Sequence, residues 1–176
     1  ATPWQTTADG VEMAGGDLVA AVERAIAELV AGAAAEQPIA AVGVTGMGEA
    51  GVLVDGHGTP TTPIIAWYDE RGDVDRLIAE LPDLTARTGM AATPVATVFK
   101  LPGLLATGAG RRWLNVPEYV VAALGGEQFA ELSLAGRTGL FDLHRNEWWD
   151  DGLAALGVDR TLFAGDPQLG TVGAGR

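Results

Sequence analysis

The stretch from Ile39 to Arg71 constrains the fold most strongly, because short apolar runs alternate there with glycine-rich turns. Ile39–Val44 is apolar and rich in β-branched residues, which predicts a short buried strand. The glycines at and just after its end let another group approach the backbone closely, since no Cβ stands in the way. They are Gly43, Gly46 and Gly48.

A second strand is predicted at Gly51–Asp55, with the turn Gly56-His57-Gly58 after it. Glycine is 25 of the 176 residues, about twice the average share of roughly 7%. This content favours turns and close backbone packing and argues against a helical bundle.

Pro63–Ala66 predicts a third strand that delivers polar and aromatic residues at alternate positions. Alternation would place Trp67, Asp69 and Arg71 on one face, and Tyr68 and Glu70 on the other. An indole, a carboxylate and a guanidinium on one wall suit a polyol or sugar. The alternative is that the tryptophan packs in the core and the glycines only form turns.

The remaining pattern alternates helices with strands, which is typical of a layered α/β fold. Asp17 is predicted to cap a helix that Gly32 closes and that leads into the strand at residue 39. Further helices are expected at 74–81, from Thr93-Pro94 to Pro102-Gly103, at 117–124 and at 150–157. Further strands are expected at 128–133 and 140–143, and a loop at 87–89.

Charge and composition exclude several kinds of partner. The net charge of −12 repels phosphate backbones and anionic lipid, so neither nucleic acid nor a membrane is expected. Cysteine is absent, and His57 and His144 are isolated, so no thiolate or histidine metal site is predicted. No signal peptide or membrane-spanning run is visible, which predicts a cytoplasmic protein.

Several ordered motifs resemble the FGGY carbohydrate kinases, a family that includes glycerol, xylulose, ribulose, gluconate and fucose kinases. The first three are GVTGMGE (43–49), VLVDGHGTP (52–60) and IIAWYDER (64–71). They are followed by RTGM (87–90), TVFKL (97–101), SLAGRTGLFD (133–142) and WWDDGLAALGVD (148–159). Their order makes the resemblance specific. It implies an α/β, actin-like (ribonuclease-H-like) fold: the N-terminal domain of a sugar kinase, lacking its first strands.

The resemblance also implies a substrate-binding wall formed by Gly48, Glu49, Trp67 and Asp69. A carboxylate such as that of Glu49 can accept hydroxyl hydrogen bonds, each worth ~1.5–3 kcal/mol when charge-assisted. The alternatives are an exposed turn glutamate and a tryptophan that serves packing. Gly48 stands where relatives carry Arg or Met, so their substrate preference does not transfer to this chain.

Other motif residues are expected to support this wall. Arg71 is predicted to be a structural partner of a carboxylate. Lys100 either neutralises an acidic residue near the pocket or is solvated on its helix. Gly103 stands where the family usually has Trp, which predicts a weaker wall beside the lysine. Arg137-Thr138 is expected to close a turn.

The sequence lacks the phosphate-handling motifs of a kinase. No D-x-G-T-T hairpin and no G-x-x-x-x-G-K-[ST] loop occurs in it. No catalytic, cofactor-binding or metal-binding residue is therefore assigned within 1–176, and the base is expected after Arg176. ATP and Mg²⁺ are expected in the intact protein, and neither is expected to be bound by this segment alone.

These observations predict that residues 1–176 are an incomplete sugar-binding domain and that the C-terminal nucleotide-binding domain is absent. The intact enzyme would phosphorylate a small ketose or polyol, with xylulose the first choice. Expected partners are the sugar, the rest of the kinase chain and, as one option, a second copy. One alternative is a non-catalytic carbohydrate-binding or regulatory module. Another is a folded scaffold in which Glu49 and Trp67 serve packing alone.

Overall fold

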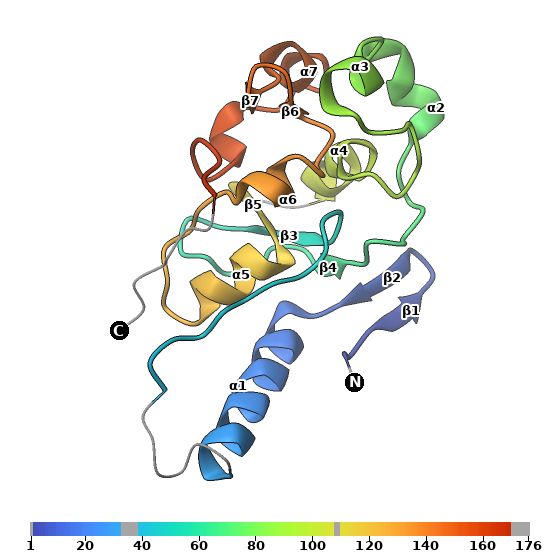
Figure 1. Cartoon of the computed structure of the whole chain (residues 1–176). Helices are drawn as coiled ribbons and strands as arrows, with labels where there is room; N and C mark the ends of the chain where they lie inside the picture. Colours follow the sequence, from blue (N-terminus) through green and yellow to red (C-terminus); the bar gives the residue numbers. More distant parts are fainter. Residues whose placement is uncertain (1, 33–38, 108–109, 170–176) are drawn as a thin grey trace.

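A five-stranded antiparallel sheet with helices on both faces forms the centre of the computed structural model, which describes residues 2–32, 39–107 and 110–169 (Figure 1). The strand order is β1-β2-β4-β3-β5. The strands are β1 (Gln5–Thr7), β2 (Gly10–Met13), β3 (Gly51–Val54), β4 (Ile64–Ile65) and β5 (Arg112–Asn115). A separate hairpin joins β6 (Phe141–Asp142) to β7 (Glu147–Trp148). The predicted α/β class is confirmed.

Two apolar cores cover the two faces of the sheet, as strand alternation requires. Leu53 belongs to the larger core, while its neighbours Val52 and Val54 belong to the smaller one. Helices α4 (Thr97–Thr107) and α7 (Asp150–Ala155) supply the larger core, and α1 (Gly15–Ala31) and α5 (Val116–Ala123) supply the smaller one (Figure 1). The shorter helices are α2 (Val74–Leu77), η1 (Ile78–Glu80), α3 (Leu84–Thr88), α6 (Leu132–Ala135) and η2 (Arg160–Leu162).

Local signals placed several elements correctly. Gly32 closes α1, with its N–H donating to Glu28 and Leu29 carbonyls, although the helix begins two residues before Asp17. The strand at 51–55 is confirmed as β3. The turn after it forms because the Asp55 carboxylate accepts the N–H groups of His57 and Thr59. The helix expected at 74–81 is present as α2 followed by η1.

The predicted strand at Ile39–Val44 is wrong. Residues 39–47 belong to no helix or strand, and within the described chain no backbone hydrogen bond pairs them with a neighbour. Ile39, Val42 and Met47 are 41%, 54% and 54% exposed. An apolar β-branched run becomes a buried strand only when partner strands lie on its edges, and the described sheet supplies none there.

The predicted alternation after Ala66 is also wrong. Strand β4 ends at Ile65, and the chain then turns, with the Asp69 N–H donating to the Ala66 carbonyl at 3.1 Å. Trp67 is consequently 43% exposed, whereas Asp69 is buried. The two side chains therefore do not share one strand face.

Three further expectations differ from the structure. Helix α4 begins at Thr97 instead of Thr93 and continues through Pro102 to Thr107. The strand expected at 128–133 does not form: only an isolated bridge from Glu131 to Gln168 is present, and α6 begins at Leu132, capped by the Glu131 carboxylate. The loop expected at 87–89 instead contains the end of α3, which Gly89 terminates at φ 68°. Strand β5 was not predicted.

No helix within the described residues has both the length and the apolar character needed to cross a bilayer.

Candidate functional site

A buried lysine joins the two loops that carry the predicted site residues. Lys100 lies on α4 and is 2% exposed. Its Nζ donates to the Glu49 carbonyl at 3.0 Å and to the Ala66 carbonyl at 3.1 Å. Burial lowers the pKa of Lys100 to about 8, even though the carboxylates of Asp69 and Glu49 favour its charged form. Of the two roles considered for this lysine, solvation is excluded by its burial.

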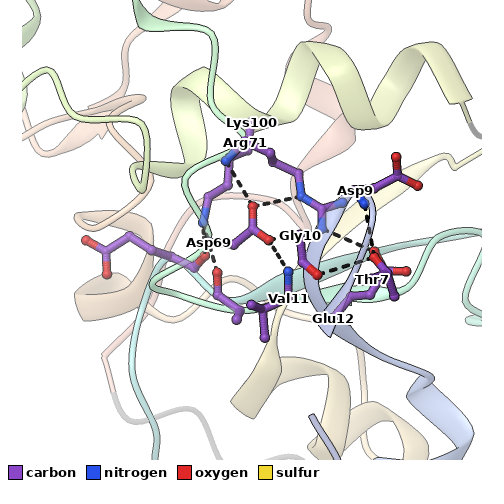
Figure 2. A network of polar contacts seen from close by, with 10 residues as sticks. Thr7, Asp9, Gly10, Val11, Glu12, Asp69, Arg71 and Lys100 are labelled. Atoms are coloured by element: carbon purple, nitrogen blue, oxygen red, sulfur yellow. Dashed lines mark hydrogen bonds and ion pairs between the residues drawn. The ribbon is translucent and has the colours of Figure 1, made fainter. Parts of the chain in front are cut away.

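Asp69 is fully engaged by its own loop and by β2 (Figure 2). Its Oδ1 accepts the Arg71 backbone N–H at 3.0 Å and the Arg71 Nε–H at 2.8 Å. Its Oδ2 accepts the Val11 N–H and the Arg71 Nη2–H. Burial would raise the pKa of Asp69, but the bonds from Arg71 and Val11 outweigh it and hold the pKa below its usual value.

Arg71 extends this network to the second strand, since its Nη2 also lies 3.1 Å from a carboxylate oxygen of Glu12 (Figure 2). The prediction that Arg71 is a structural partner of a carboxylate is confirmed. Gly10 is part of the same arrangement: its φ is +134°, and a Cβ there would overlap the Asp69 carboxylate. Sequence reasoning missed this glycine, although its place in the turn between two polar segments was a usable signal.

Glu49 is buried and held in an unusual backbone conformation. Its φ is +62°, which a non-glycine residue adopts rarely and at a cost. Its carboxylate forms an ion pair with Arg137, whose side chain is 55% exposed. Gly48 lies directly against the aliphatic part of the same arginine, where a Cβ would overlap the Arg137 side chain. Gly48, Glu49 and Arg137 therefore form one unit: Arg137 pairs with Glu49 and packs against Gly48. We call it the Glu49–Arg137 pair.

Trp67 lies at the surface beside other aromatic rings. Its indole meets Tyr68 edge-on at 5.3 Å between ring centroids, and Tyr68 meets Trp4 edge-on at 6.4 Å. With 43% of Trp67 exposed, the interpretation that it serves core packing does not hold. An exposed indole face can stack on the C–H face of a sugar.

The Lys100 ammonium group therefore bonds to both the Glu49 loop and the loop that begins at Ala66. None of the four predicted residues, however, lines either of two hollows found among the described residues. These hollows, of about 600 Å³ and about 510 Å³, are formed by other described residues. The larger is lined by Lys100, Arg71 and Gly103, among others. A Cβ at Gly103 would meet nothing within 4 Å, which agrees with the expected weaker wall beside the lysine.

Within residues 2–32, 39–107 and 110–169, no three His, Cys, Asp or Glu side chains are grouped so that they could hold a metal ion.

Comparisons with known proteins show the family to which the chain belongs. A family model described as the FGGY family of carbohydrate kinases, N-terminal domain, matches residues 7–169. A glycerol kinase from Herminiimonas arsenicoxydans is 31% identical over 150 residues, covering 77% of this chain and 30% of the relative. An L-fuculokinase from Escherichia coli (strain K12) is 30% identical over 151 residues, covering 76% of this chain and 31% of the relative. The chain thus spans about a third of the length of these curated relatives.

A solved structure gives the same answer for the fold. The crystal structure of a xyloylose kinase from Brucella ovis matches with a TM-score of 0.81 and 26% identity. The match covers 98% of this chain and 37% of the solved one. It confirms the predicted actin-like α/β fold of a sugar kinase N-terminal domain.

Proposed function

We propose a function from the finding that this chain belongs to the FGGY family of carbohydrate kinases. It forms the sugar-facing wall of an ATP-dependent kinase that acts on a small ketose or polyol. The observation that carries this proposal is the junction at Lys100, where one ammonium group holds the loops of Glu49 and Trp67 together. Both loops belong to the motifs that resemble the family. We also propose that the nucleotide-binding domain lies elsewhere in the intact protein, because the relatives are about three times as long.

The four predicted residues take different roles in this proposal. The Glu49 carboxylate accepts hydroxyl hydrogen bonds from the sugar, and the Trp67 indole faces its C–H surface. Gly48 leaves the space that Arg137 occupies. Asp69 remains a predicted substrate ligand, but its four hydrogen bonds favour a supporting role in which it fixes the turn that presents Trp67.

The proposed reaction moves the γ-phosphoryl group of ATP to a sugar hydroxyl. The new bond joins the hydroxyl oxygen to phosphorus, the bond from that phosphorus to ADP breaks, and a base takes the hydroxyl proton. The sequence has neither a D-x-G-T-T hairpin nor a G-x-x-x-x-G-K-[ST] phosphate loop. No step of the transfer is therefore assigned to this chain, whose residues would bind and orient the sugar.

Xylulose-type ketoses are the first substrates to test. The layout of GVTGMGEAGVLVD (43–55) is closer to xylulose kinases than to glycerol kinases. The relatives reported above are named as a glycerol kinase, an L-fuculokinase and a xyloylose kinase, so the trial set must be broad. A cytoplasmic location and a homodimer remain predictions.

A coupled assay of ADP release by the full-length protein tests the proposal. Xylulose, ribulose, fuculose, glycerol and gluconate would each be supplied with ATP and Mg²⁺. We expect sugar-dependent ADP release, and its loss in Glu49→Ala. The matched control is Glu147→Ala, since Glu147 is exposed and pairs with Arg145 at 3.5 Å, away from Lys100. Sugar binding without ADP release would instead support the non-catalytic module.

A further inference from the structure

The absence of a side chain at Gly48 lets Arg137 pack directly against the loop that carries Glu49. The Arg137 Cβ and Cγ fill the space that a side chain at position 48 would need. The arginine comes from a segment 88 residues away in sequence, so this contact is a product of the fold. Its guanidinium is thereby delivered to the Glu49 carboxylate, while 55% of its side chain stays exposed.

The pair presents donors and an acceptor side by side. The Arg137 Nη2 donates to Glu49 Oε1, and within the described chain no other hydrogen bond or ion pair engages the guanidinium or Glu49 Oε2. A guanidinium carries five N–H donors and a carboxylate only accepts. A hydroxyl group both donates and accepts, so neighbouring hydroxyls of a sugar match this surface.

Charges around this surface cancel. Arg137 and Glu49 form one neutral pair. Nearby, Arg71 pairs with Asp69 and Glu12, and the charges of Asp69 and Glu49 act on the ammonium group of Lys100. A ligand carboxylate would therefore meet Glu49 without a cation left over to compensate it, and like charges at close range cost binding energy.

We infer that Arg137 is a further specificity-determining residue, which pairs with Glu49 to form a neutral surface that selects uncharged ketoses and polyols over sugar acids. This inference rests on the proposed function and deepens it. The arginine holds the Glu49 carboxylate in place and offers its remaining N–H groups to sugar oxygens.

The test compares kcat/KM of the full-length protein for its best neutral sugar and for gluconate and xylonate. Glu49→Gln leaves the arginine cation uncompensated, so the ratio of acid to neutral activity should rise by about tenfold or more. Arg137→Gln should lower kcat/KM for the neutral sugar roughly 10–100-fold, mainly through KM, because a charge-assisted hydrogen bond is lost. It should not improve activity on the acids. Arg137→Lys keeps the charge and should retain the wild-type ratio.

The matched control is Arg145→Gln, which removes an arginine from the exposed Arg145–Glu147 pair. It should leave both activities within about twofold, as expected for a weak surface pair. If Arg137→Gln fails to fold, Glu49→Gln and Arg137→Lys decide the question. An unchanged ratio in Glu49→Gln, or a wild-type preference for the acids, would overturn the inference and leave the kinase activity standing. No activity on any sugar would overturn the proposed function and the inference together.

Discussion

Two carboxylates near the same lysine are held in different ways. Asp69 accepts four hydrogen bonds from Arg71 and Val11, so both of its oxygens are fully used. Glu49 has one ion pair with an arginine that is more than half exposed. The difference separates a carboxylate whose two oxygens are both bonded by the protein from one whose Oε2 has no hydrogen-bond partner within the described chain.

The two carboxylate residues also differ in backbone conformation. Glu49 adopts φ +62° without being glycine, whereas Asp69 does not have a positive φ. A residue in the left-handed region costs of order 1–3 kcal/mol and is commonly found at functional sites. The Lys100 bond to the Glu49 carbonyl and the Arg137 ion pair together hold this conformation.

The largest expected effect on the free energy of unfolding comes from removing the Asp69 carboxylate. Asp69→Ala leaves the Arg71 guanidinium, only 19% exposed, without its main partner. We expect a loss of roughly 3–5 kcal/mol in the free energy of unfolding, as for a broken buried pair. Urea denaturation of the full-length protein, followed by tryptophan fluorescence, measures this loss. Glu49→Ala should cost less, about 1–3 kcal/mol, because Glu49 is buried but its only ion-pair partner in the described chain, Arg137, is more than half exposed. Equal losses would remove the distinction between the two carboxylates.

A smaller effect should appear in the pH dependence of stability. The pKa of Lys100 is lowered by burial from 10.5 to about 8. Between these values the unfolded chain binds a proton that the folded chain does not, so the free energy of unfolding rises as pH rises. The rise should amount to about 3 kcal/mol at most.

Lys100→Met should remove this part of the slope. The measurement is urea denaturation of wild type and variant at pH 8 and pH 10, compared as a difference so that other groups cancel. Parallel slopes in the two proteins would show that the lysine is not desolvated at the junction of the two loops.

The smallest stability effect is expected for Trp67→Ala. The indole is 43% exposed, so its removal should change the free energy of unfolding by about 1 kcal/mol or less. Sugar binding should weaken by about 0.5–1.5 kcal/mol, the range of a single aromatic contact. Thermal melts and sugar titrations on the same preparation check both values. A large loss of stability with unchanged sugar binding would assign Trp67 to packing.

The parts of the fold that depend on neighbouring residues were predictable from the sequence. Helix α1 ends at Gly32, β3 occupies the expected span, and the turn at 56–58 follows from Asp55 and its glycines. The partnership of Arg71 with a carboxylate was also predicted, because the guanidinium geometry suits it.

The rest depends on residues far apart in sequence. Ile39–Val44 has the composition of a buried strand, but pairing on its edges decides whether one forms. Lys100 reaches carbonyls 51 and 34 residues away, and Arg137 reaches a carboxylate 88 residues away. Composition and periodicity carry no information about such contacts, so the junction of the two loops was visible only in three dimensions.

Titration calorimetry of the full-length protein with its sugar tests most directly the claim that Glu49 is the ligand-facing carboxylate. Glu49→Gln should weaken the Kd by roughly tenfold or more, since a charge-assisted hydrogen bond is lost. Glu147→Gln should bind as wild type does. A Glu49→Gln variant that is folded and binds the sugar with wild-type affinity would contradict the account.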